Sequence, residues 1–178
     1  DKLKNKEFKL LYLVGSDNLE IKKNEEFIIY QGSHGDKNAS IADVILPSPT
    51  YTEQNGLFEN LEGRIQECRK ASYPTNEALE DWKIFNLINY SLNKSDLFSD
   101  FSSIRELALQ EIPDFSEIDL LPKKKKPVKT NILLEAFSEK INIKNIDYYY
   151  SNSIARASKT MSDCRNISND NKKNGINK

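Results

Sequence analysis

The stretch that decides the fold is Glu26-Phe27-Ile28-Ile29-Tyr30-Gln31-Gly32-Ser33-His34-Gly35. A short, continuous apolar run is closed here by glycines and small polar residues, which is the pattern of a β-strand followed by a turn. A continuous run, in contrast to an alternating one, is typical of a strand that is covered on both faces, as in a parallel sheet. The stretch therefore predicts a buried parallel strand with a polar loop at its carboxyl end.

Two similar runs flank this strand. Lys9–Val14 is apolar and is closed by Gly15-Ser16-Asp17-Asn18, and Ile41–Leu46 ends at Pro47. Only about 12 residues separate the first two runs, so we expect a short helix or a loop around Leu19–Asn24 between them. Residues 1–70 are accordingly interpreted as α/β with mostly parallel strands, and the resemblance given below implies that they form the end of their domain.

The chain changes character after this sheet. Residues 52–69 are polar, and we expect irregular structure there with one short strand at its centre. Residues 71–121 follow as a helical segment. Its first helix should begin after Thr75 as N-cap. The apolar residues of that helix recur at helical spacing and predict one buried face, made of Leu79, Trp82, Phe85, Ile88 and Leu92.

A second helix is predicted over Ile104–Glu111. Ser103-Ile104-Arg105-Glu106 has the form of a capping box, and Pro113 cannot continue a helix. Residues 122–130 are interpreted as a linker, because the run Lys123–Lys126 stands between prolines and its like charges repel one another. The run could contact nucleic acid or acidic lipid, but charge runs of this kind are more often solvated loops.

Residues 131–178 are interpreted as a C-terminal helical extension. We expect one helix over Ile132–Ile141 and another that places Ile154, Ala157, Ser158 and Met161 on one face. Ser151 or Asn152 would cap the second helix. From Asn166 the chain is rich in Asn and Lys and has little to bury, which predicts a disordered tail.

Composition excludes several classes of function. The 178 residues carry 26 basic and 27 acidic side chains, a balance that argues against a general polyanion binder. Residues 123–178 hold 13 of the basic and 5 of the acidic side chains, so the charge is uneven. The longest apolar runs are far shorter than the roughly 20 residues that span a bilayer.

Cysteine and histidine usage limits the possible chemistry further. Cys68 and Cys164 are 96 positions apart, so the chain offers neither a zinc pattern nor four thiolates for an iron–sulfur cluster. His34 is the only histidine and lies in a predicted turn, so a metal site would depend on carboxylates and a catalytic triad would have to use His34. Dinucleotide, P-loop and nucleophile-elbow motifs are absent from the sequence.

Two groups of carboxylates leave alternatives open. Asp43 lies within an apolar strand pattern and is either a perturbed carboxylate or, more often at such positions, an acceptor for nearby backbone amides. Glu53, Glu59 and Glu62 lie near Arg64 in sequence and predict an ion-pair network as well as any acid–base role. We name no catalytic, cofactor-binding or metal-binding residue on these grounds.

The motifs of the N-terminal half resemble those of molybdopterin-type oxidoreductase domains. The similar segments are Phe27–Asp36, Ile41–Pro47, and Tyr51–Arg64 with its pattern of Glu53, Gly56, Asn60, Glu62, Gly63 and Arg64. Within that superfamily, Tyr30-Gln31-Gly32 and His34-Gly35-Asp36 resemble the large iron–sulfur (75 kDa) subunits of respiratory NADH:ubiquinone oxidoreductase, complex I. Glu80–Ile84 and Ser153–Met161 resemble further segments of those subunits, in the same order along the chain.

The resemblance implies a scaffold role in NADH-to-ubiquinone electron transfer, on the matrix side of the mitochondrial inner membrane. It covers only about the last quarter of such a subunit, so we expect a split or separately encoded C-terminal piece. The resemblance implies no cofactor in this chain, with iron–sulfur clusters and flavin in partner chains. The expected partners are the cluster-bearing N-terminal part and other peripheral-arm subunits, with no nucleic acid and no direct membrane insertion.

Two alternatives remain at this point. One is the C-terminal fragment of a true molybdenum enzyme such as a formate dehydrogenase, for which bound molybdenum would be decisive. The other is a non-enzymatic interaction module whose basic C-terminal part binds acidic partners, with an affinity that falls steeply as salt is added.

Overall fold

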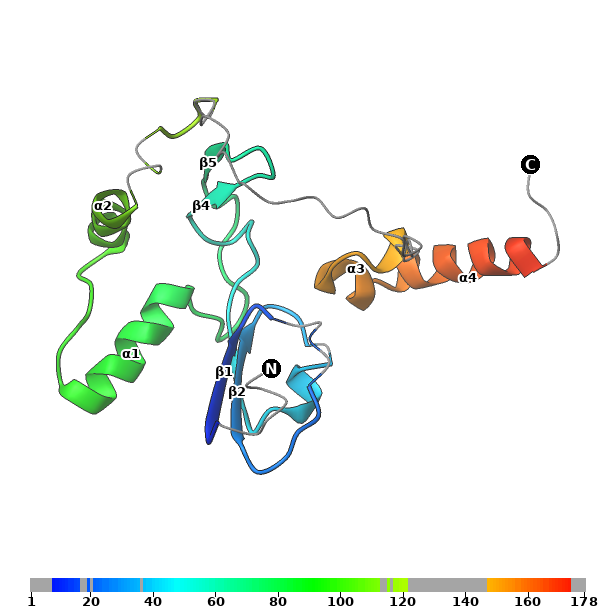
Figure 1. Ribbon diagram of the computed structural model, residues 1–178, viewed down its shortest axis with the longest axis horizontal. Coiled ribbons are helices and arrows are strands. Elements are labelled where there is room, and N and C mark those ends of the chain that lie inside the picture. The colour runs from blue at the N-terminus through cyan, green and yellow to red at the C-terminus, as the bar shows by residue number, and fades with distance from the viewer. Residues whose placement is uncertain are drawn as a thin grey trace, which may run out of the picture. The chain divides into compact units, whose positions relative to one another are not determined.

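The computed structural model describes residues 8–16, 19, 21–35, 37–112, 115, 117–121 and 147–173. The chain divides into two compact units, residues 1–121 and 122–178, which are drawn in Figure 1 and are treated separately below. Among the described residues, no helix is both long enough and apolar enough to cross a lipid bilayer.

A three-stranded parallel sheet forms the start of the N-terminal unit. The strands β1 (Leu10–Val14), β2 (Phe27–Gly32) and β3 (Val44–Pro47) lie side by side in that order. The register pairs Leu10 with Phe27 and Ile29 with Val44. The predicted parallel strands are confirmed, and the described residues between β1 and β2 form the loop alternative. The third strand begins at Val44, later than predicted, because Ala39–Ile41 forms the short 3-10 helix η1.

The core of this unit lies against one face of the sheet. Leu13, Ile28 and Tyr30 are at most 5% exposed and cluster with Ala39 of η1. These strand residues share a face because side chains alternate along each strand and the register places Leu13 beside Tyr30. The expectation that both faces are covered holds for the centre of this face, although Ile45 of β3 on the same side is exposed, and several apolar side chains of the opposite face are exposed as well.

A β-hairpin follows where a single short strand was predicted. The strands β4 (Gly56–Glu59) and β5 (Ile65–Cys68) pair in antiparallel fashion. Asn60 closes the turn, since its side-chain oxygen accepts the backbone N–H groups of Glu62 and Arg64. The second strand was missed because only Ile65 within it is buried, so its sequence lacks an apolar run.

The first long helix, α1 (Asp81–Asn93), begins later than predicted. Thr75 is not its N-cap: the Thr75 hydroxyl donates to the Glu53 carboxylate, and Asn76 adopts a positive φ of 54°, which interrupts a helix. Glu80 occupies the N-cap position instead. In Figure 1, α1 and η1 lie on opposite sides of the sheet.

The second long helix, α2 (Phe101–Glu111), begins three residues earlier than predicted. Asp100 is the N-cap, because its carboxylate accepts the backbone N–H of Ser103 at 2.8 Å. Ser103 occupies the third helical position and its hydroxyl accepts the N–H of Asp100 in return. A capping box is therefore present, but Ser103 has the opposite role in it from the predicted one.

The C-terminal unit contains a 3-10 turn and two helices among its described residues: η3 (Tyr148–Tyr150), α3 (Ser153–Ala157) and α4 (Lys159–Lys173). The Asn152 side chain accepts the N–H of Ala155, so the predicted Asn152 cap is confirmed. The chain remains helical to Lys173, so the prediction of disorder from Asn166 is wrong up to that residue. The predicted linker at 122–130 and the helix over Ile132–Ile141 lie outside the described residues.

Ser158 divides the predicted C-terminal helix into two. Its backbone is extended, with φ −81° and ψ 122°, which ends α3. Its hydroxyl oxygen then accepts the N–H of Met161 and caps α4. Serine competes with helical hydrogen bonding in this way at helix ends, so the predicted continuous face through Ser158 is broken.

Candidate functional site

A pocket of about 730 Å³ lies at the carboxyl ends of β2 and β3. Open α/β sheets bind ligands beyond the carboxyl ends of their strands, so this is where a site is expected. Its polar lining comes from the loops after these strands and from residues 75–77, and includes Ser33, His34, Ser48, Thr50, Glu53 and Glu77.

The walls of this pocket are fixed by hydrogen bonds. The Glu53 carboxylate accepts the N–H of Thr50 at 3.1 Å and the hydroxyl of Thr75 at 3.3 Å, which joins two loops. The Tyr30 hydroxyl donates to the backbone carbonyl of His34 at 2.8 Å and fixes the loop after β2. His34 is thus held by its backbone, while its imidazole nitrogen Nδ1 lies 3.0 Å from the Ser33 hydroxyl.

Glycine at position 32 allows the Tyr30 ring to lie against the strand. A Cβ atom placed on Gly32 would lie 2.6 Å from the Tyr30 hydroxyl oxygen and 2.8 Å from its ring carbon Cζ. Both distances are too short for any side chain unless the ring moves. Because the Tyr30 ring is 2% exposed, it has little room to move, and Gly32 is required for this packing.

The charged groups of the pocket are acidic. Among the described lining residues, Glu53 and Glu77 carry carboxylates and none is lysine or arginine. The Glu53 carboxylate is already engaged by the two hydrogen bonds described above. The pocket therefore favours neutral or cationic groups over phosphate-bearing ligands.

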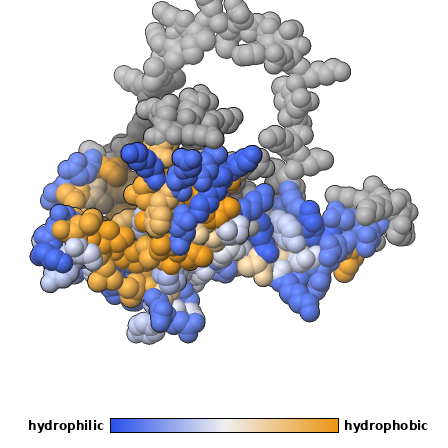
Figure 2. All heavy atoms as spheres, turned by 90° about the horizontal axis from the view of Figure 1, so that it is seen from below, coloured by the Kyte–Doolittle hydropathy of each residue, from blue (hydrophilic) through white to orange (hydrophobic). Residues whose placement is uncertain are grey.

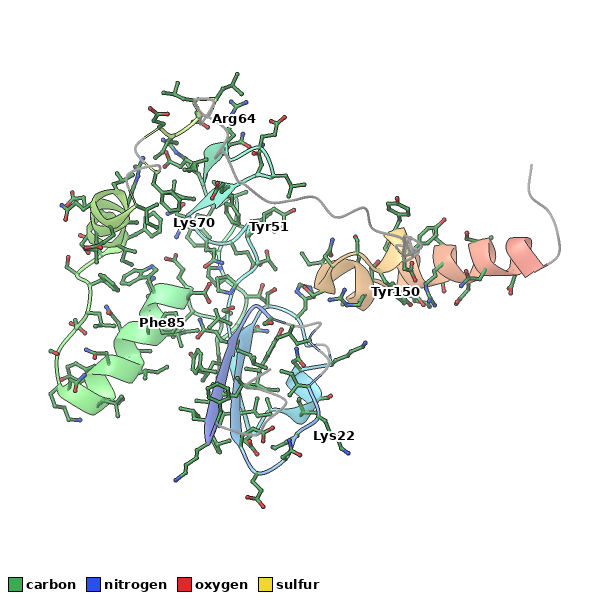
Figure 3. The ribbon with its side chains drawn as sticks, viewed as in Figure 1. Lys22, Tyr51, Arg64, Lys70, Phe85 and Tyr150 are labelled. Atoms are coloured by element: carbon green, nitrogen blue, oxygen red, sulfur yellow. The ribbon has the colours of Figure 1, made fainter. Side chains whose placement is uncertain are left out.

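A buried amide on the other face of the sheet joins the strands to α1. The Gln31 side chain is fully buried; its oxygen accepts the hydroxyl of Tyr12, and its nitrogen donates to the Asp81 carboxylate at 2.6 Å. Burial, and then the nearby negative charge of Asp81, raises the pKa of Tyr12, so its hydroxyl stays protonated and donates. Figure 3 shows Phe85 on α1, and its ring centroid lies 5.9 Å from that of Tyr12.

The carboxylate at the start of α1 is also buried. Glu80 accepts the indole N–H of Trp82 at 2.7 Å and the ammonium group of Lys70 at 3.2 Å. Burial alone would raise the pKa of Glu80, but these hydrogen bonds outweigh it and the pKa lies below its ordinary value. Glu80 therefore stays ionised and fixes the segment around Lys70 to the helix.

The sequence-derived carboxylate candidates have structural roles. Asp43 accepts the backbone N–H of Ile28 at 2.8 Å and the ammonium group of Lys23, so the backbone-acceptor alternative is confirmed. The hydrogen bond from Lys23, followed by that from Ile28, lowers the pKa of Asp43. Arg64 donates to the backbone carbonyl of Asp119, and the ion pairs found among the described residues do not join it to the predicted glutamates.

The motif of the C-terminal unit packs around one tyrosine. Arg165 lies over the Tyr150 ring at 4.6 Å and pairs with Asp147, whose pKa is lowered by that hydrogen bond. The Tyr150 hydroxyl donates to Ser162, and Arg156 donates to the Tyr150 backbone carbonyl. These contacts join α3 and α4 to η3.

The side chains that could ligate a metal are dispersed in the described part of the chain. Cys68 is half-buried and its thiol donates to the backbone carbonyl of Tyr51 at 3.5 Å. Groups of three or more His, Cys, Asp and Glu side chains placed to hold a metal ion do not occur among these residues.

Comparison with known proteins assigns the sheet and its motifs. The family model for molybdopterin oxidoreductases matches residues 1–89, which include the three parallel strands, the pocket and most of α1. The chain belongs to this family. The matched range also contains the Gln31 and Glu80 networks, so both networks lie within the family's domain.

Curated relatives match nearly the whole of this chain. It is 36% identical to the NADH-ubiquinone oxidoreductase 75 kDa subunit of Reclinomonas americana, over 88% of this chain and 23% of that relative. It is 38% identical to the mitochondrial 78 kDa subunit of Candida albicans, with the same coverage. It is 38% identical to an NADH-quinone oxidoreductase subunit of Rickettsia bellii, over 90% of this chain and 24% of that relative. The chain thus spans about a quarter of the length of these relatives.

Most of the motif residues that carry the family resemblance belong to the hydrogen-bond and packing contacts described above. Only some of them line the pocket. Tyr30, Gln31, Gly32, Glu80 and Asp81 all take part in the contacts described above. Sequence reasoning did not find that Gln31 bonds to Asp81. The sequence did contain a sign of this contact: Gln31 lies in a strand that is predicted to be buried, and a buried amide needs hydrogen-bond partners.

We predict that Gly32→Ala lowers the free energy of unfolding by about 1–3 kcal/mol, because the added methyl group overpacks against the Tyr30 ring. Urea denaturation of the chain measures the difference. Gly35→Ala is the matched control: its Cβ would meet only the Ala39 Cβ, at an ordinary 3.7 Å, and should leave stability nearly unchanged. Equal losses for the two variants would contradict the packing role of Gly32.

We predict that Gln31→Leu destabilises the chain by about 1–3 kcal/mol, because it leaves the Tyr12 hydroxyl and the Asp81 carboxylate without their partner. The same substitution at the exposed Gln66 of β5 is the control and should change stability by less than about 0.5 kcal/mol. Urea denaturation followed by circular dichroism gives both values. A neutral effect of Gln31→Leu would show that the amide network does not stabilise the unit.

We predict that the stabilising effect of Glu80 is lost in acid. Its pKa is lower in the folded chain than its ordinary value of 4.5, so the contribution is complete above about pH 5 and disappears as the pH falls through the folded pKa. Glu80→Gln should therefore be less stable than the wild type near pH 7, and the gap should shrink towards about pH 3.5. Thermal unfolding at both pH values measures the gap, with the exposed Glu77→Gln as control. A gap that is independent of pH would contradict an ionised Glu80.

Proposed function

We propose that this chain is a structural part of the large iron–sulfur subunit of respiratory NADH:ubiquinone oxidoreductase, complex I, and that it supports electron transfer from NADH to quinone without binding a redox centre itself. The observation that carries the proposal is the extent of the similarity. Relatives named as subunits of NADH-ubiquinone or NADH-quinone oxidoreductase match 88–91% of this chain, whereas the molybdopterin oxidoreductase family model matches residues 1–89, which are half of it.

The second unit supports the choice among members of the family. The molybdopterin oxidoreductase match ends at residue 89, and the described C-terminal unit begins at Asp147. The matches to the NADH-ubiquinone oxidoreductase subunits, 160 and 172 residues long, cannot be confined to residues 1–89, so they extend beyond the shared domain. A chain from a molybdenum enzyme would not be expected to share that further region with these subunits.

The pocket chemistry supports a role without a molybdopterin cofactor. Such a cofactor carries phosphate, which proteins bind with cationic side chains or helix N-termini. The described lining presents Glu53 and Glu77 and lacks lysine and arginine, so these residues do not fit the group. We propose that the family's ligand crevice persists here only as a structural feature, while iron–sulfur clusters and flavin are held elsewhere in the assembly.

The proposal assigns the remaining tasks to other chains or regions. The partners would be the cluster-bearing part of the same subunit and the neighbouring subunits of the peripheral arm, on the matrix side of the mitochondrial inner membrane. The Candida albicans relative is a mitochondrial subunit, which supports this location. Whether the cluster-bearing part is a separate polypeptide is part of the test.

We predict that this chain runs in the band that oxidises NADH when detergent-solubilised mitochondrial membranes are separated on a native gel. Mass spectrometry of the band should find its peptides beside cluster-bearing sequence, and would show whether that sequence is a separate polypeptide. Metal analysis of the band should find iron and no molybdenum. Absence of the chain from the band, or its recovery with molybdenum, would overturn the proposal.

A further inference from the structure

One face of the parallel sheet presents apolar side chains to solvent. Leu10 and Val14 of β1, Phe27 of β2 and Val44 of β3 are 56%, 46%, 47% and 37% exposed. They share a face because the register pairs Leu10 with Phe27, and Val44 with Ile29, two positions along β2 from Phe27. We call these four residues the open sheet face.

The composition of this side of the sheet is that of an interior. The other strand residues on the same side are Tyr12, Ile29, Gln31 and Leu46, so none of the eight carries a charge. A sheet face that is exposed to water normally carries polar side chains. Parallel sheets, in contrast, are usually covered on both faces and carry apolar side chains on both. The exposure of the open sheet face is therefore at odds with its sequence.

Part of this side of the sheet is covered by the helix α1. α1 lies over Tyr12 and Gln31, through the Tyr12–Phe85 ring contact and the Gln31–Asp81 hydrogen bond. Phe85 is itself 37% exposed, so the apolar surface continues from the strands onto the helix. Figure 2 shows hydrophobic residues gathered over a broad area on one side of the N-terminal unit.

The edge of the sheet beside this face is equally unprotected. β1 is an outer strand of the described sheet, and its five residues, Leu10–Val14, include neither a charge nor a proline. Exposed edge strands normally carry such residues because an unprotected edge pairs with other chains. The edge of β1 is suited to accept a further strand.

We propose that the open sheet face and the edge of β1 dock onto the part of the molybdopterin-type chain that lies outside these 178 residues. The proposal rests on the proposed function only for the identity of the assembly. The relatives are about four times as long as their match to this chain, which contributes three parallel strands to the family's domain. The remainder is the occupant that fits this surface, because parallel sheets are covered on both sides and the relatives carry about three quarters of their length outside the matched segment, enough to supply further strands and cover. The docking is the same whether that remainder is joined to this chain or is a separate polypeptide.

The test compares two positions of equal exposure on opposite faces of the sheet. A photo-reactive phenylalanine analogue replaces Leu10 in one variant and Ile45 in another, since these side chains are 56% and 54% exposed and both lie on outer strands. Ile45 pairs with Tyr30, so it belongs to the core-facing side. Each variant is expressed in the cells that make the protein, the membranes are irradiated, and the cross-linked peptides are sequenced by mass spectrometry.

We expect the probe at position 10 to cross-link to peptides that align with the part of the relatives outside the matched segment, with a yield about tenfold above that at position 45. Cross-links from position 10 to a second copy of this chain, or to residues 122–146, would overturn the proposal, because another occupant would then cover the face. Equal yields at the two positions, or none, would overturn it as well.

A charge on the same face gives an independent measurement. Leu10→Glu should lower the fraction of the chain in its large assembly by about tenfold, because a carboxylate would be buried without a partner. Ile45→Glu should lower it by less than about twofold. Equal effects of the two variants would overturn the proposal.

The two proposals fail separately in these experiments. A chain that runs in the NADH-oxidising band but cross-links elsewhere leaves the proposed function standing and removes the docking surface. A chain that is absent from that band, but whose position 10 cross-links to molybdopterin-type sequence in another assembly, removes the proposed function and keeps the docking surface.

Discussion

The side-chain amide of Gln31 joins the sheet to the first helix, and the arrangement of the N-terminal unit depends on it. The amide is fully buried between the Tyr12 hydroxyl and the Asp81 carboxylate, so each of its two ends has a partner on a different element. An unpaired buried amide would cost far more than a formed hydrogen bond contributes. Because of that asymmetry, α1 is held at one place on the sheet, and the Glu80 network then fixes the segment around Lys70 to the same helix.

The sheet could be predicted from sequence because its signals are local. The apolar runs that became β1, β2 and β3 are short and continuous and end at glycine, polar or proline residues, and this length and flanking pattern favours strands over helices. Helix starts were harder to predict, because several residues compete for each cap. Thr75 and Ser103 both have side chains that can act as an N-cap. However, the Thr75 hydroxyl donates to Glu53, and Ser103 donates its backbone N–H to Asp100, which is the N-cap.

The contacts that build the site could not be predicted for a different reason. Gln31 and Asp81 are 50 positions apart, and the sequence around either residue does not indicate that the other is its partner. The pocket likewise combines loops after two strands with residues 75–77, and its acidic character arises only when Glu53 and Glu77 come together. Sequence motifs included Gln31, Asp81 and Glu53 but not Glu77, and the roles of all four came from their positions in the folded chain.

The distribution of the motif residues bears on the proposed scaffold role. A cofactor site needs polar groups that are free to meet a ligand, whereas here the Glu53 carboxylate and the Tyr30 hydroxyl are engaged with the protein's own backbone and side chains. Groups that are satisfied internally stabilise the loops and leave less affinity for a ligand. The same residues that position loops around a cofactor can therefore be kept for rigidity alone. The proposed scaffold role needs such rigidity, and the proposed docking through the uncharged, partly exposed face of the sheet would use it to hold neighbouring parts in place.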